Sequence, residues 1–98
     1  MSTLNDNQAA QIAKALGDPN RLCVFTQISQ NKELFCGEMH AKDAISPATL
    51  SHHLKVLTEA NLITSRREGQ NMYYRTRPET IEAYREYLAG ITESTIAR

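Results

Sequence analysis

The sequence predicts a mostly α-helical protein with a small β-hairpin, arranged as a winged helix-turn-helix of about five helices and a two-stranded wing. Two observations predict this class. A capped amphipathic helix spans residues 46–60, and two strand-like runs, 62–67 and 72–76, follow it across a polar turn. A short helical segment and a turn precede that helix, which is helix-turn-helix spacing. The length predicts a single domain over residues 1–98.

The capped helix has a clear start and a single apolar stripe. Ser46 is a good N-cap, and Pro47 suits the first helical position, where a missing N–H costs nothing. Leu50, Leu54 and Leu57 recur at the spacing of one helix face. The side chains away from this stripe are small, hydrogen-bonding or basic, and they are Ala48, Thr49, Ser51, His52 and Lys55. Such a face could approach a DNA groove closely.

Four further helices are expected, at residues 7–16, 20–30, 37–42 and from Pro78 onward. The segment 17–19 separates the first two helices, because it supplies a glycine stop, an aspartate N-cap and a proline at the first turn. The first and last helices each carry an apolar stripe. We expect these stripes to form a homodimer interface through Ile12, Leu16, Ile81, Tyr84 and Leu88. The alternative is that both helices pack on the central helices of their own chain.

Positive charge gathers on the capped helix and the hairpin, although the whole chain has a net charge of zero. Residues 46–77 hold five basic side chains and two acidic ones, a net charge of +3, and the basic ones are Lys55, Arg66, Arg67, Arg75 and Arg77. A local basic patch is what binding of DNA phosphates requires. The alternative is an ordinary solvated face. A winged helix used only for protein contacts also stays open, although such a module should show apolar residues on the capped helix.

Other classes of protein find little support. No run approaches the roughly 18 apolar residues of a membrane helix, and no signal peptide opens the chain. The two cysteines have no framework spacing, which indicates a reducing compartment, so we expect a cytoplasmic protein that contacts no membrane. The sequence shows no catalytic triad spacing, glycine-rich phosphate loop or metal triad, so we expect no enzyme and no cofactor.

Three segments in the right order resemble the ArsR/SmtB-type bacterial repressors: residues 15–22, 49–57 and 66–74. The likeness spans roughly residues 9–89. It implies a five-helix, two-strand fold, a dimer formed by the first and last helices, and binding to double-stranded operator DNA that blocks transcription. Two copies of the capped helix would then lie about 34 Å apart and read an inverted repeat.

The resemblance also implies which residues contact DNA. Thr49, Ser51 and His52 match base- and backbone-contacting positions, and Lys55 suits a phosphate. The wing would contribute Arg66, Arg67, Gln70 and Asn71. Many relatives carry a long polar residue at position 47, whereas Pro47, beside Ala48, offers no side-chain hydrogen bond. Base readout there is therefore expected to be lost or to move to Thr49.

Two expectations concern neighbouring aromatic side chains. His53 lies beside the leucine stripe, so we expect it to be half-buried and bonded to the backbone rather than to DNA. Tyr73 and Tyr74 are consecutive in a strand, so one should pack on the core and the other should face outward.

The sequence departs from the family where metal-responsive members hold a Cys-x-Cys pair. Phe35 and Gly37 stand at the two ligand positions, on either side of Cys36, and one thiolate cannot complete a soft-metal site. We therefore assign no metal site, the alternative being Cys36 with His40 and Glu38. Cys23 and Cys36 could be small apolar fillers or a thiol-based switch that responds to oxidants or reactive sulfur. The effector, if one exists, stays open.

Overall fold

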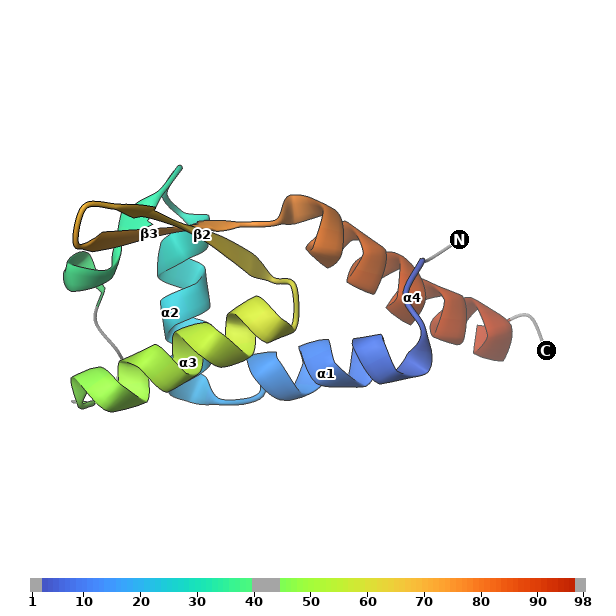
Figure 1. Cartoon of the computed structure of the whole chain (residues 1–98). Helices are drawn as coiled ribbons and strands as arrows, with labels where there is room; N and C mark the ends of the chain where they lie inside the picture. Colours follow the sequence, from blue (N-terminus) through green and yellow to red (C-terminus); the bar gives the residue numbers. More distant parts are fainter. Residues whose placement is uncertain (1–2, 40–44, 97–98) are drawn as a thin grey trace.

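The computed structural model describes residues 3–39 and 45–96 and confirms the mostly helical class with a wing (Figure 1). The elements are, in chain order, α1 (Asp6–Leu16), α2 (Pro19–Ser29), β1 (Leu34–Phe35), a 3₁₀ helix η1 (Cys36–Glu38), α3 (Pro47–Glu59), β2 (Ile63–Glu68), β3 (Asn71–Thr76) and α4 (Pro78–Ile96). The described residues thus contain four α-helices and a three-stranded antiparallel sheet in the order β1-β3-β2.

Side-chain caps start the first three α-helices where the sequence allows them. The Asn5 side chain accepts from the backbone N–H of Gln8, and the Gln8 side chain accepts from the backbone N–H of Asn5, which completes a capping box. The side chains of Asp18 and Ser46 likewise accept from a backbone N–H in the first turn of α2 and of α3. Helix α3 ends at Glu59, Ala60 is its C-cap, and Asn61 follows with a φ of 60°, in the left-handed region. The Leu62 N–H then reaches back to the Leu57 carbonyl at 3.0 Å, the long-range bond of a Schellman motif.

In its described part, the short helix expected at residues 37–42 is the 3₁₀ helix η1 rather than an α-helix. Just before it, Leu34 and Phe35 pair with Tyr74 and Tyr73, so they add a third strand, which was not expected, to the two-stranded wing. Residues 40–44 lie outside the described part of the chain. The edge of β3 offers unpaired backbone groups, and pairing them satisfies the polar backbone of this segment. A two-residue strand is too short to show an alternating pattern in the sequence.

The core lies between the helices and one face of the sheet. Its fully buried side chains come from α1, α2, α3 and the segment entering β2, and the largest are Ile12, Val24, Ile28, Leu57, Leu62 and Ile63. Ile12 is only 1% exposed, so it packs inside its own chain and is not available to a partner. The expectation that Ile12 forms a dimer contact is therefore wrong for this residue, because Ile12 belongs to the core cluster that α1 forms with α2 and α3.

The molecule is elongated, with principal extents of 53 × 26 × 22 Å. Figure 1 shows the start of α3 and the β2–β3 turn at one end, and both chain termini at the other. Helix α4 extends away from the core alongside α1, and the Tyr87 hydroxyl donates to the Asp6 carboxylate at 2.5 Å. The two ends of the molecule can therefore have separate roles.

Candidate nucleic-acid interface

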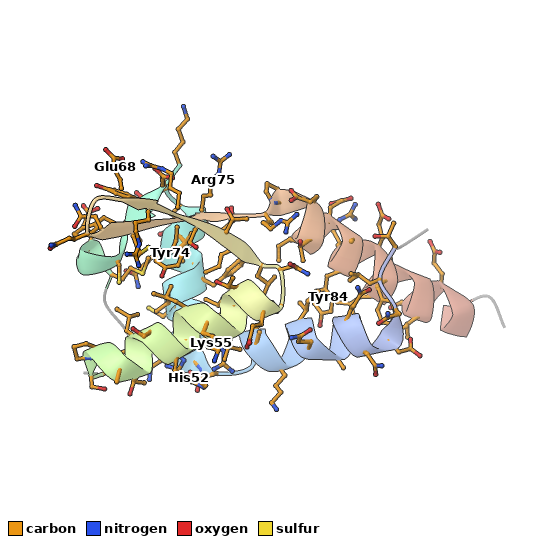
Figure 2. All side chains as sticks on the ribbon, viewed as in Figure 1. His52, Lys55, Glu68, Tyr74, Arg75 and Tyr84 are labelled. Atoms are coloured by element: carbon orange, nitrogen blue, oxygen red, sulfur yellow. The ribbon has the colours of Figure 1, made fainter. Side chains whose placement is uncertain are left out.

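The expected DNA-contacting face of α3 is open to solvent. All six of its residues are exposed: Pro47, Ala48, Thr49, Ser51, His52 and Lys55. Figure 2 shows His52 and Lys55 on the side of α3 away from the sheet. The opposite face is buried through Leu54 and Leu57, as the leucine stripe predicts. The packing of one stripe therefore fixes which side chains α3 presents outward.

The Thr49 hydroxyl is held in place by the helix cap. The Thr49 N–H donates to the Ser46 Oγ at 3.1 Å, and the two hydroxyl oxygens lie 3.0 Å apart in a second hydrogen bond. A hydroxyl oxygen has two lone pairs and one proton, so Thr49 keeps hydrogen-bonding capacity beyond this contact. The cap therefore orients the Thr49 hydroxyl at the start of α3 and leaves it able to make a further hydrogen bond.

The tip of the wing is a two-residue turn. Glu68 pairs with Asn71, which leaves Gly69 and Gln70 as the loop. Gly69 has φ of +63°, and among the described residues only Asn61 shares a positive φ. A glycine at the first central position is typical of a type II′ turn, whose twist suits a hairpin. The turn leaves both Gln70 and Asn71 exposed at the tip, as their expected role requires.

The two arginines of the wing lie on opposite faces of the sheet. Side chains alternate along a strand, so Arg67 shares a face with Ser65 and with Ile63, which is only 1% exposed. That is the face on which the helices pack. Arg66 therefore lies on the outer face, opposite Tyr73 in the register. Of the two, only Arg67 is on the same side of the sheet as α3.

Arg66 is engaged within its own chain. Its Nε and Nη2 donate to the two oxygens of Glu33 at 2.8 and 2.7 Å, and its Nη1 donates to Glu68 at 2.6 Å. Its guanidinium also lies over the Tyr73 ring, 4.6 Å from the centroid. These hydrogen bonds lower the pKa of the Glu33 carboxyl and raise the pKa of Arg66. Arg66 thus ties the wing to the segment before β1.

The basic patch is therefore smaller than the sequence indicates. Arg77 is paired with Glu79 at 3.0 Å, as Arg66 is with its two glutamates. Within residues 3–39 and 45–96, the other three basic residues of the patch make no ion pair, and they are Lys55, Arg67 and Arg75. Arg75 is on the outer face, where it lines a hollow with Lys32 and Arg66. The charges left for DNA beside α3 are those of Lys55 and Arg67.

His53 and the two tyrosines have partners that decide their roles. His53 is 6% exposed, but the expectation of a backbone bond is wrong, because its Nδ1 lies 3.3 Å from Nη1 of Arg21. Tyr74 packs against the core, and Tyr73 faces outward, where it stacks with Phe35 at 5.5 Å between centroids. The expectation of opposite faces for the tyrosines is thus confirmed.

The remaining expected dimer residues differ in exposure. Leu16, Ile81 and Tyr84 are partly buried against the core, whereas Leu88 is 44% exposed and Ile91, one turn further, is 52% exposed. A hollow of about 220 Å³ opens between α1 and α4, lined by Asp6, Ala9, Ala10, Ala13, Tyr84, Tyr87 and Leu88. Small side chains on α1 and large ones on α4 thus border a surface at the end of the molecule opposite the wing.

Both cysteines are half-buried thiols. Cys23 lies on α2, where the Gln27 Nε2 donates to its Sγ at 3.5 Å, and Cys36 packs against the core at the start of η1. The described residues hold no cluster of three or more metal-ligating side chains, and His40 lies outside them. No described helix has the length and apolar character that crossing a membrane demands.

Comparison with known proteins agrees with this geometry. A helix-turn-helix domain family matches residues 16–66. The uncharacterized HTH-type transcriptional regulator YceK of Bacillus subtilis is 38% identical over 95 residues, 96% of this chain and 92% of its own length. The arsenical resistance operon repressor of Staphylococcus xylosus is 33% identical over 92 residues, 89% of this chain and 83% of its own.

A solved structure shares the fold. The solution structure of the homodimeric winged helix-turn-helix DNA-binding domain of Mb0332 from Mycobacterium bovis, a possible ArsR-family regulator, superposes with a TM-score of 0.68. The match covers 100% of this chain and 96% of that one at 23% identity. The relatives are regulators of transcription rather than enzymes. The chain belongs to the ArsR/SmtB family of winged helix-turn-helix transcriptional regulators.

Proposed function

We propose that this protein is a repressor that binds an inverted-repeat operator as a homodimer, with α3 in the major groove and the wing beside it. The observation that carries the proposal is the solvent-exposed face of α3 (Pro47, Ala48, Thr49, Ser51, His52 and Lys55), with Arg67 on the same side of the sheet. Such a face lets the backbone of α3 approach base edges, while the two cations contact phosphates. The protein would act in the cytoplasm.

The homodimer is proposed through α1 and α4. Leu88 and Ile91 expose apolar surface on the part of α4 that extends beyond the core, next to the hollow against α1. An apolar ridge beside a groove is a self-complementary shape, which a two-fold symmetric dimer uses twice. The homodimeric state of Mb0332, which has the same fold, supports a homodimer for this chain as well. The ends of the two protomers that carry α3 and the wing would then face one side of the DNA, with the α3 helices about 34 Å apart.

We call the exposed face of α3, together with Arg67 of the wing, the reading face. Its charge predicts a moderate dependence of DNA affinity on salt concentration. Lys55 and Arg67 are the two cations of that face without an ion pair, so a dimer has four. Each phosphate contact contributes about −0.9 to the slope of log affinity against log salt, so four predict a slope of about −3.6.

The experiment is a fluorescence-anisotropy titration of the purified chain with DNA from upstream of its own gene, against a scrambled duplex of equal length. Binding of the native duplex that is at least about a thousandfold tighter, with one dimer per inverted repeat, supports the proposal. Equal affinity for both duplexes, or no dependence on salt, contradicts it. Repeating the titration with arsenite, zinc, hydrogen peroxide and sulfide then asks what releases the DNA.

The two thiols make the oxidant and sulfide arms the informative ones. Cys23 and Cys36 lie in elements that pack directly on the core, so their oxidation would disturb the helix-turn-helix. A Cys23→Ser and Cys36→Ser double variant is the matched control. Release of DNA by peroxide in the native chain but not in this variant supports a thiol switch, and equal behaviour of the two rejects it.

A further inference from the structure

The side chain of Arg21, a residue of α2, contacts both α1 and α3 and so joins three helices. Its Nε donates to the Ala15 carbonyl at 2.6 Å and its Nη2 to the Lys14 carbonyl at 3.1 Å, both at the carboxyl end of α1. Its own backbone N–H donates to the Asp18 cap at the start of α2. Its Nη1 lies 3.3 Å from Nδ1 of His53 on α3. A planar guanidinium with five fixed donors can serve these acceptors together, which a lysine cannot.

The chemistry of this contact fixes the state of His53. Arginine stays protonated and has only donors, so Nη1 of Arg21 must donate and Nδ1 of His53 must accept. The imidazole is then neutral and carries its proton on Nε2. Burial lowers the pKa of His53, and the positive charges of Arg21 and His52 lower it further, whereas Asp18 raises it. A proton on Nδ1 would place two donors face to face at a buried contact.

The position of His53 connects this junction to the reading face. His53 follows directly after Ser51 and His52, and it is buried on the opposite side of the same helix turn. Because α3 is a rigid helix, the angle at which its buried side rests on α1 and α2 sets the angle of its exposed side. Apolar contacts through Leu54 and Leu57 hold α3 down but are not directional. The bond to Arg21 is directional.

We propose that Arg21 and His53 form a positioning pair that sets the docking angle of α3 on DNA, and that protonation of His53 releases it. The inference rests on the proposed DNA-binding function, which it deepens. Neither residue touches DNA: Arg21 holds the corner of α1 and α2, and His53 transmits that position to α3. The charged and titratable groups around the imidazole are Arg21 and Asp18 from the α1–α2 corner and His52 from α3 itself.

The first test compares variants that keep or remove the acceptor. His53→Asn places an amide oxygen close to the position of Nδ1 and does not titrate, whereas His53→Leu fills the space without an acceptor. Arg21→Lys keeps the charge but loses the fork. Anisotropy at pH 7.5 should show a loss of affinity of about tenfold for His53→Leu and Arg21→Lys, the equivalent of one hydrogen bond to a charged group. His53→Asn should restore most of that affinity.

The second test is the pH profile. It is measured in a His52→Gln background, because His52 lies on the DNA face and its removal leaves His53 as the one histidine of α3. In this background, affinity should fall about threefold to tenfold as the pH drops below about 6.5, the ordinary histidine value, and protonates His53, and His53→Asn should abolish the fall. Circular dichroism at each pH verifies that every variant is folded. Equal affinities for His53→Leu and His53→Asn, or a fall that His53→Asn leaves unchanged, overturn the proposal.

A third measurement needs no DNA. The ¹⁵N chemical shifts of the ring report which nitrogen carries the proton, and we expect the Nε2–H form for His53 at pH 7.5. The Nδ1–H form would overturn the pairing whatever the binding data show. This measurement uses the native chain, so it holds even if His53→Leu folds poorly and drops out of the affinity test. If the native chain binds no operator, the repressor function fails while this measurement still decides whether the pair exists.

Discussion

The neighbouring arginines of the wing allow a matched test of the reading face. Arg67→Ala removes a cation on the side of the sheet that faces α3, and Arg66→Ala removes one from the outer face. Each phosphate contact contributes about 5.5-fold to affinity at 0.15 M salt, so the loss of two per dimer should weaken binding about thirtyfold. The slope of log affinity against log salt should become shallower by about 1.8. The loss should be alike for specific and scrambled DNA, because phosphates carry no sequence.

Arg66→Ala should behave differently because its guanidinium is already shared between Glu33 and Glu68 and lies over Tyr73. We expect an unchanged salt slope and a small decrease in melting temperature, since the pair is exposed and screened. The assay is fluorescence anisotropy at four salt concentrations, with thermal unfolding followed by circular dichroism. A slope that changes as much for Arg66→Ala as for Arg67→Ala would refute the assignment of faces. An unchanged slope for Arg67→Ala would refute the phosphate contact.

Three further predictions address the dimer, the wing and the buried histidine. Leu88→Glu should convert the dimer to monomers in light scattering after size-exclusion chromatography, whereas Glu93→Lys, an exposed charge change on the other face of α4, should not; a dimeric Leu88→Glu chain would move the interface elsewhere. Gly69→Ala should lower the free energy of unfolding by about 1 kcal/mol in urea titrations, because alanine is strained at positive φ, and Gly69→Asn should cost less; equal losses would argue against a strained turn. The pKa of His53 is lowered on folding, so the unfolded chain takes up a proton first, and stability should decrease as the pH falls below about 6.5, the ordinary histidine value. Urea midpoints at pH 7.5 and 5.5 measure this decrease, which should be smaller in His53→Asn, and an identical decrease in both chains would refute it.

Much of the fold could be predicted from the sequence because the deciding interactions are local. Caps act over three residues, so Asp18 and Ser46 mark helix starts by themselves. The leucine stripe of α3 repeats within the same helix, and the exposed polar face follows from it. The hairpin is equally local, since a glycine turn between two strand-like runs fixes its own register.

The tertiary structure decided what depends on distant partners. Leu34 and Phe35 form a strand only because β3 offers an edge some forty positions later in the chain. Two residues are too few for the sequence pattern to predict this pairing. In the sequence Arg66 cannot be told from its neighbour Arg67, and only the fold brings Glu33 within hydrogen-bond distance of Arg66. Likewise, Ile12 proved to be core rather than interface because it belongs to the core cluster that α1 forms with α2 and α3.

The reading face itself divides along this line. Sequence by itself determined which side chains α3 exposes, because helical periodicity alone sorts Leu54 and Leu57 from Ser51 and His52. Only the tertiary structure decided what holds that helix at its angle, through a contact between Arg21 and His53 that spans 32 positions. Periodicity reports on neighbours a few residues apart, whereas a hydrogen bond between distant side chains exists only once the core has brought their helices together.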